Sequence, residues 1–174
     1  MERLVKGKII THLEGNNLIG DSEHGFRHKS SCLTRLLDFF ASVIDTYDAG
    51  TKKAVDLIYL DFQKTFDKVP HEMLLVKVAH GIQGSTALWI RNWLAGWRQR
   101  ACINQTFSSW IRVRSGLRQG NVLGPLLLII YINDLDNSIV SKIPKFSDDT
   151  KLCRSSGDLD EILELQADFN RLVD

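Results

Sequence analysis

The stretch from Asp56 to Pro70, DLIYLDFQKTFDKVP, limits what this 174-residue chain can fold into more than any other. It holds a short apolar and aromatic run made of Leu57, Ile58, Tyr59, Leu60 and Phe62. Such a run is too brief for a helix and predicts a strand buried on both faces. Asp61 lies inside it. An unpaired carboxylate is very costly to bury, so we expect Asp61 to be neutralised, paired or used as a cation ligand.

A second acidic site lies between Lys145 and Cys153, in KFSDDTKLC. Asp148 and Asp149 stand between two strand-like flanks, as at the tip of a β-hairpin. Three carboxylates on strand ends could converge on hard divalent cations, as two-metal phosphoryl transfer requires. Each signal also has an ordinary explanation. An Asp-Asp pair is usually a solvated turn, and Asp61 alone is more often a strand-end residue that pairs with a lysine or caps the next element.

Composition narrows the class of protein. With 44% hydrophobic residues, the chain is long enough for one domain that buries about 70% of its unfolded surface. The formal net charge is +1, so any nucleic-acid groove must be a local feature. The three cysteines, Cys32, Cys102 and Cys153, show no CxxC spacing. This pattern argues against a disulfide scaffold or a zinc site and fits a reducing compartment.

No membrane or secretory signal is visible. The longest apolar run, PLLLIIYI from Pro125 to Ile132, is far shorter than the roughly 20 residues that span a bilayer and predicts a core element. The N-terminus lacks a long apolar segment followed by a cleavage site. We therefore expect an intracellular protein, nuclear or cytoplasmic, that does not associate with membranes. Sparse Pro and Gly give no clear linker and predict a single compact unit.

Periodicity predicts two helices before the Asp61 strand. The first covers residues 3 to 14 and stops at Gly15. The second is capped by Ser31. Its predicted face consists of Leu33, Leu36, Leu37, Phe40, Val43 and Ile44. Between them, the basic segment from Gly25 to Ser31 reads equally well as a solvated loop or a nucleic-acid contact.

Three further helices follow the strand. Pro70 can sit in the first turn of one that ends near Gly81. Ser85 opens another, and Asp158 with Glu161 resembles the capping box of the last. The predicted inward residues of these helices are Leu74, Leu75 and Val78; Leu88, Trp89, Trp93 and Leu94; and Ile162, Leu165, Phe169, Leu172 and Val173.

Residues 100–104 and 107–114 read as paired strands. Next comes a pliable glycine-bearing loop around Arg118 and Gln119, followed by a helix from about Gly124. A donor-bearing loop before a helix is a plausible place for a nucleotide or template strand. Helices and strands mix without a regular βαβ alternation. This predicts an α+β fold, an antiparallel sheet backed by helices.

Several blocks, in order and spacing, resemble the reverse transcriptase of non-LTR (LINE-type, jockey-like) retrotransposons. They are GFRHKSSCLT, YLDFQKTFDKVPHEMLL, HGIQG, SGLRQGNVLGPLLLIIYINDL, KFSDDTKLC and LQADFNRLVD. The resemblance covers nearly the whole chain. It implies a right-hand polymerase palm over residues 51–174 and a fingers-like portion over residues 1–50, without the thumb and the upstream fingers.

The resemblance also implies roles for the acidic residues. Asp61, Asp148 and Asp149 would be the catalytic, metal-binding carboxylates of the palm. The cofactor would be two Mg²⁺ ions, which Mn²⁺ can replace. The primer 3′-hydroxyl would attack the α-phosphate of a deoxynucleotide and pyrophosphate would leave.

Other positions match the family's substrate contacts. Phe66 matches a bulky gate that excludes a 2′-hydroxyl. The nucleotide-binding set is Phe62, Phe66, Gln119 and Gly120, and the nucleic-acid-binding set is Arg27, Lys29 and Arg118. Implied partners are an RNA template, a DNA primer and deoxynucleoside triphosphates.

The chain departs from the family pattern at Thr65 and Ser147, where alanine is usual, and at Arg118, where proline is common. None of these changes touches a carboxylate. Three hypotheses remain open at this point: an RNA-directed DNA polymerase domain, a catalytically silent nucleic-acid-binding remnant of such an element, and a two-metal nuclease. The nuclease would not need Phe66 or the Gln119 loop.

Overall fold

The computed structural model describes residues 1–20, 33, 36–37, 39–41, 43–44, 54–62, 64–118, 120–146 and 149–173, without the side chains of Phe146 and Asp149. The chain forms two compact units. Unit 1 consists of Met1–Leu18 and Lys64–Tyr131, and unit 2 consists of Ile19–Gln63 and Ile132–Asp174. No sign of this division is visible in the sequence, and the assignment of residues 1–174 to one partial domain stays a prediction. Each unit joins segments far apart in sequence, and composition alone does not reveal such pairings.

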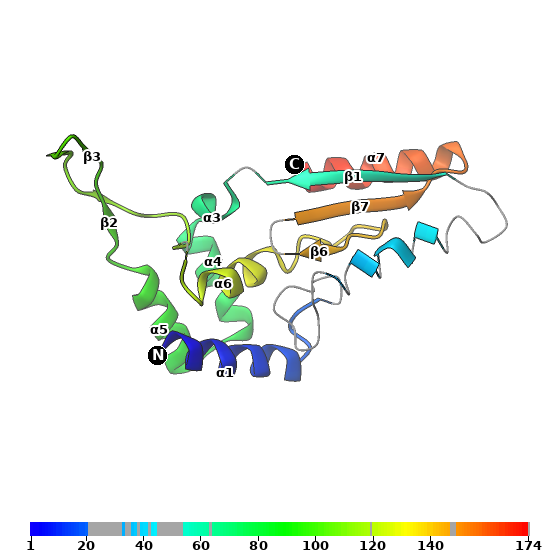
Figure 1. Cartoon of the computed structure of the whole chain (residues 1–174). Coiled ribbons are helices and arrows are strands. Elements are labelled where there is room, and N and C mark those ends of the chain that lie inside the picture. Colours follow the sequence, from blue (N-terminus) through cyan, green and yellow to red (C-terminus); the bar gives the residue numbers. More distant parts are fainter. Residues whose placement is uncertain are drawn as a thin grey trace. The chain divides into compact units, whose positions relative to one another are not determined.

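A three-stranded antiparallel sheet forms the centre of unit 2 (Figure 1). Its strands are β1 (Val55–Asp61), β6 (Lys145–Phe146) and β7 (Asp149–Ser155), in the order β1-β7-β6. The helix α7 (Leu159–Val173) packs on it through a core of Ile143, Leu152 and Leu165. These elements confirm the predicted strand, the predicted hairpin and the α+β class. The fingers and palm division stays a prediction.

Strand β1 is not buried on both faces, contrary to the prediction. It lies at an edge of the sheet. Asp56, Tyr59 and Asp61 are exposed, and Tyr59 keeps 68% of its surface. Ile58 is partly buried and packs against the core. A continuous apolar run marks a strand but does not report whether a second layer covers it, and Asp61 therefore needs no buried partner.

The residues described between 33 and 44 are helical, as predicted. The buried one is Phe39, whose ring lies 4.6 Å from Lys151 Nζ on β7. Five members of the predicted apolar face are exposed: Leu33, Leu36, Leu37, Phe40 and Ile44. The periodicity found the helix but assigned the wrong residue to the core. The predicted cap Ser31 lies outside the described residues.

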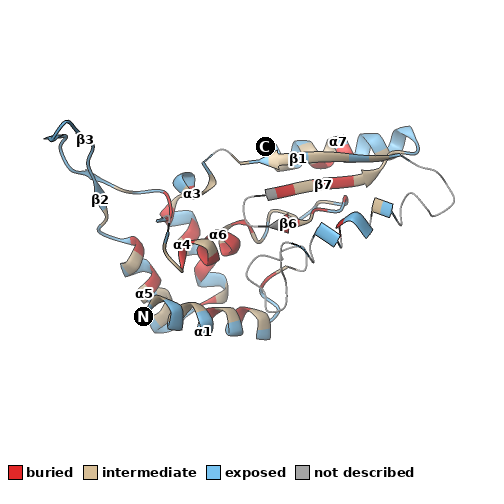
Figure 2. Cartoon of the chain, in the orientation of Figure 1, coloured by how far each residue is buried: buried red, intermediate tan, exposed pale blue. Residues whose placement is uncertain are grey.

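Unit 1 is mainly helical. Its helices are α1 (Glu2–Gly15), α3 (Thr65–Lys68), α4 (His71–Gly81), α5 (Gly84–Leu94) and α6 (Gly124–Ile132), the last of which ends one residue into unit 2. Helix α6 is almost wholly buried (Figure 2), which confirms PLLLIIYI as a core element. Pro70 stands at the N-cap of α4, and Leu74 and Val78 are buried as predicted. On α5, Ile90 and Leu94 are buried whereas Leu88 is 55% exposed. The predicted inward face was therefore right for Leu94 but wrong for Leu88, and it left out Ile90.

A ribbon of four short strands joins α5 to the loop before α6. Strand β2 (Arg98–Gln99) pairs with β5 (Ile111–Arg112), and β3 (Cys102–Ile103) pairs with β4 (Thr106–Phe107). The turn residues Asn104 and Gln105 have φ values of 48° and 64°. Two successive left-handed residues are what a type I′ hairpin requires. The predicted strand pair is confirmed, and every residue from 98 to 112 is exposed (Figure 2).

Candidate active site

Strand pairing in unit 2 brings two predicted catalytic positions together. Asp61, the last residue of β1, is the direct backbone partner of Asp149, the first residue of β7. Directly opposed residues of antiparallel strands have Cα atoms about 4.5 to 5.5 Å apart. The exposed Asp61 carboxylate and the start of β7 therefore lie at the same end of the sheet.

Asp148 and the side chain of Asp149 lie outside the described residues, so their carboxylates are not located. Among the side chains that are described, no group of three His, Cys, Asp or Glu residues could hold a metal ion. Asp61 nevertheless suits a hard cation such as Mg²⁺, because it is an exposed oxygen ligand at a strand end.

In unit 1, the predicted gate residue and the predicted substrate loop share a backbone contact. Phe66 on α3 is partly buried, and its carbonyl accepts a hydrogen bond of 2.6 Å from the Leu117 amide. The Gly116 amide donates to the Val69 carbonyl at 2.8 Å. The loop that leads to Arg118 is therefore anchored on the segment that carries Phe66.

Gly116 is required at this contact. Its φ is 92°, and a Cβ built there would lie 2.8 Å from the Asp67 carbonyl oxygen. His71 Nε2 lies 2.8 Å from the Gly116 carbonyl. A carbonyl only accepts, so this ring nitrogen carries the proton. Close backbone packing thus fixes the start of the loop.

An aromatic cluster holds Arg118. Its guanidinium carbon lies 3.7 Å from the centre of the Trp97 ring, and Trp97 contacts Trp93 edge to face at 5.1 Å. Trp93 donates from its indole nitrogen to Glu2 on α1 at 3.0 Å. The face of an indole ring attracts a guanidinium group. The Trp97 ring therefore orients the Arg118 side chain. The predicted contact of Arg118 with nucleic acid stays a prediction.

Asn121 was not singled out from the sequence, yet it closes the loop. Its side-chain oxygen accepts from the Gly124 amide and its side-chain nitrogen donates to the Arg118 carbonyl, both at 2.5 Å. The first contact satisfies a free amide at the start of α6. An asparagine just before a predicted helix is a capping signal that could have identified it. Gly120 is exposed with φ 80°.

Lys145 was also missed. It is fully buried on β6, and its Nζ lies 2.6 Å from Asp136 Oδ1. The carbonyls of Asn133 and Ile132 lie 3.3 Å and 3.4 Å away. A buried ammonium requires such partners. The lysine ties the stem of the acidic hairpin to the chain that follows α6, and only the tertiary contacts reveal this.

Asp168 on α7 is a fully buried carboxylate. Burial opposes its ionisation, but amide donors from Ser141 at 2.7 Å and Val140 at 3.2 Å, with Arg171 at 2.6 Å, outweigh that effect. The nearby Ser141 hydroxyl also favours the ionised form, although its oxygen makes no hydrogen bond of good geometry. The pKa of Asp168 is therefore lowered. Asp168 joins α7 to the segment before β6.

Several other predicted positions remain untested. Phe62 is partly buried and directly follows β1. Arg27, Lys29 and Gln119 lie outside the described residues. The roles assigned to all of these residues stay predictions.

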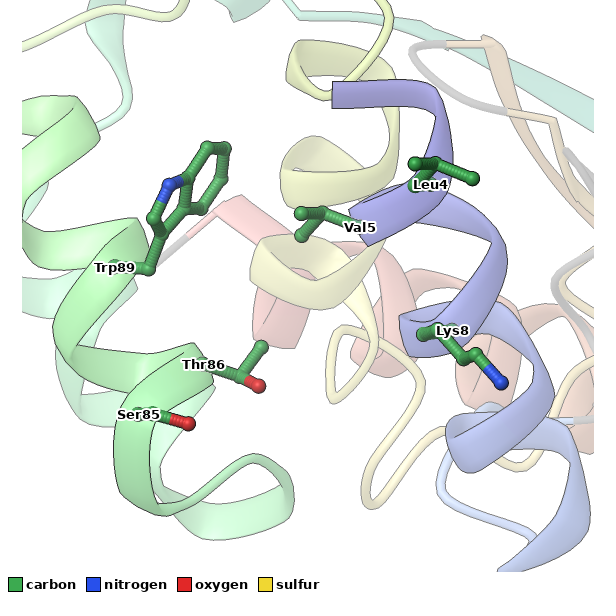
Figure 3. A pocket seen from close by; sticks show the side chains of 6 residues that line it. All are labelled: Leu4, Val5, Lys8, Ser85, Thr86 and Trp89. Carbon is green, nitrogen blue, oxygen red and sulfur yellow. The ribbon is translucent and has the colours of Figure 1, made fainter. Parts of the chain in front are cut away.

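A cavity of about 360 Å³ lies in unit 1 between α1 and α5. Figure 3 shows Val5 and Trp89 projecting toward one another, with Lys8 also in the lining. Among the residues that the structure describes, the lining holds no carboxylate and no nucleophile beyond the hydroxyls of Ser85 and Thr86. We assign this cavity no catalytic role.

Comparison with known proteins identifies the family of the chain. Residues 1–171 match the family model described as reverse transcriptase (RNA-dependent DNA polymerase). In Drosophila melanogaster, the probable RNA-directed DNA polymerase from transposon X-element is 28% identical over 153 residues, covering 85% of this chain and 17% of the relative.

Two further relatives are similar. The probable RNA-directed DNA polymerase from transposon BS of Drosophila melanogaster is 25% identical, over 77% of this chain and 15% of the relative. The RNA-directed DNA polymerase from mobile element jockey of Drosophila funebris is 28% identical, over 79% of this chain and 15% of the relative. The chain thus spans less than a fifth of the length of these relatives.

No helix among the described residues has the length and apolar character needed to cross a bilayer. The family match covers nearly the whole chain and the relatives come from mobile elements. The chain therefore belongs to the reverse transcriptase family, as a domain of the non-LTR retrotransposon type.

Proposed function

We propose that this chain forms the palm, with part of the fingers, of an RNA-directed DNA polymerase that extends a primer by deoxynucleotidyl transfer. The observation that carries the proposal is the backbone pairing of Asp61 with Asp149. It joins the two acidic blocks of the sequence at one end of one sheet. Family membership supports the same chemistry.

In this proposal, Asp61 and Asp148 hold two divalent cations and Asp149 supports them. When bound, Mg²⁺ would lower the pKa of the attacking primer hydroxyl and stabilise the charge on the leaving pyrophosphate. The contribution of the protein is to place hard oxygen ligands together at one end of the sheet. The exposure of Asp61 favours this role, because the carboxylate is accessible to a cation and a triphosphate.

Substrate selection is assigned to the residues that match the family's substrate contacts. Phe66 would lie beneath the sugar of the incoming nucleotide and reject a 2′-hydroxyl by steric contact. Phe62, Gln119 and Gly120 would contact the nucleotide, while Arg27, Lys29 and Arg118 would contact the nucleic acid. The Leu117 to Phe66 hydrogen bond supports a shared role for the gate and the loop, because movement of one backbone displaces the other. The partners are an RNA template, a DNA primer and deoxynucleoside triphosphates.

The test is primer extension by a chimera in which this chain replaces the matching segment of the X-element polymerase. Asp61→Asn removes the proposed ligand charge and should lower the extension rate by a factor of about 10³ or more, because metal positioning is lost. The matched control is Asp56→Asn, an exposed aspartate on the same strand, which should extend at the wild-type rate. If the Asp61 variant extends as fast as the Asp56 variant, the catalytic assignment is wrong. An inactive wild-type chimera that still binds RNA would instead support a silent remnant.

A further inference from the structure

The ribbon from Arg98 to Arg114 carries a local concentration of positive charge, although the chain as a whole is nearly neutral. Its sequence, RQRACINQTFSSWIRVR, contains Arg98, Arg100, Arg112 and Arg114 and no acidic residue, whereas the formal net charge of the whole chain is +1. None of these four arginines forms an ion pair with a carboxylate in the part of the chain that the structure describes. The ribbon is therefore a local cationic surface.

The register of the strand pair places two arginines opposite one another. Arg98 on β2 is the direct partner of Arg112 on β5, and both are exposed. Guanidinium groups stay protonated, and like charges at directly opposed positions destabilise a strand pair. An anion lying between the two side chains would relieve the repulsion.

A pocket at the base of the ribbon is also lined by arginines. It has a volume of about 770 Å³ and is lined by Arg91, Arg112 and Arg114. Of the described residues, the other ionisable groups that line it are Glu72 and His71. Three guanidinium groups against one carboxylate leave the pocket cationic and suited to phosphate.

Two aromatic rings of the ribbon lie next to Arg100. The guanidinium carbon of Arg100 lies 3.8 Å from the Phe107 ring centre and 4.6 Å from that of Trp110. Phe107 and Trp110 nevertheless keep 52% and 56% of their surface exposed. Arginines for phosphates, interleaved with exposed rings for bases, are what single-stranded nucleic acid requires. Duplex bases are already stacked on one another and cannot use the rings.

We propose that this basic ribbon, residues 98–114, binds a segment of single-stranded nucleic acid, with the arginines on phosphates and Phe107 and Trp110 against bases. The inference goes beyond the proposed active site, because this binding uses neither Asp61 nor a metal ion. It depends on the proposed function only for the identity of the strand, which would be the template.

The test is fluorescence anisotropy of a short labelled oligouridine with the whole chain, in EDTA and without deoxynucleotides, over a range of KCl concentrations. Arg98→Gln with Arg112→Gln removes the opposed pair. We expect binding about tenfold weaker and a salt slope smaller by about 1.4, the value for two phosphate contacts on a single strand. The matched control is Arg3→Gln with Lys8→Gln, which removes two exposed charges from α1 of the same unit and should leave the slope unchanged.

A second readout separates binding from folding. Because the opposed arginines repel, the double variant should unfold at the same temperature as the wild type or slightly higher. Trp110→Ala should weaken binding about tenfold while Trp110→Phe retains it, since stacking needs a ring. An oligothymidine arm compares DNA with RNA at the same site.

Three outcomes would overturn the proposal. The wild type shows no salt-sensitive binding; the ribbon variants bind as the wild type does; or the ribbon variants alter only the oligomeric state of the chain. Each is independent of polymerase activity, because no step of the assay requires primer extension.

Discussion

At the scale of single residues, the buried carboxylate of Asp168 makes the clearest prediction. Asp168→Ala should lower the free energy of unfolding by roughly 2 to 4 kcal/mol, because it leaves the amides of Val140 and Ser141 without their acceptor in a buried site. Chemical denaturation at neutral pH measures the loss. The matched control is Asp160→Asn, an exposed aspartate at the start of the same helix, which should change stability by less than about 1 kcal/mol.

The same residue sets a pH dependence. Its pKa is lowered in the folded chain, so its stabilising contribution is complete above the ordinary aspartate value of about 3.9 and is lost as the pH falls below it. The wild type should therefore lose stability in acid more steeply than Asp168→Asn. Equal acid dependence of the two proteins would show that Asp168 is not ionised in the native state.

At the scale of elements, the prediction concerns the contact between α3 and the loop before α6. Gly116→Ala should destabilise the chain by about 2 kcal/mol or more, since it adds left-handed strain and places a methyl group 2.8 Å from the Asp67 oxygen. Gly96→Ala supplies the control. Gly96 has φ 79° with no atom near its missing Cβ, so only strain of about 1 kcal/mol applies.

The difference between these two glycine variants measures the close approach itself. Thermal unfolding of both proteins gives the comparison, and equal losses would mean that the loop moves away from α3 at little cost. If the loop also supports nucleotide binding as proposed, Gly116→Ala in the chimera should weaken deoxynucleotide binding while Gly96→Ala should not.

At the scale of the whole molecule, binding of metal and nucleotide should appear as stability. A ligand at ten times its Kd that binds only the folded chain contributes about 1.4 kcal/mol. This corresponds to about 3 to 6 °C in melting temperature for a protein of this size. We expect Mg²⁺ with a deoxynucleotide to raise the melting temperature of the wild type and of Asp56→Asn, but not of Asp61→Asn. A shift of equal size in the Asp61 variant would place the ligand elsewhere.

The sequence by itself determined the local elements. The Asp61 strand, the acidic hairpin and the capped last helix follow from apolar runs, turn residues and caps that act over a few neighbours. The order and spacing of the acidic and glycine-bearing blocks likewise indicated the family. Such signals are local, so a single chain carries them.

Only the tertiary structure decided which faces are covered and which distant residues meet. It placed β1 at an edge, divided the chain into two units and paired Lys145 with Asp136. It also set Arg98 opposite Arg112. These outcomes depend on contacts between segments far apart in sequence, where strand register and competing partners decide the energy, and no local pattern encodes them.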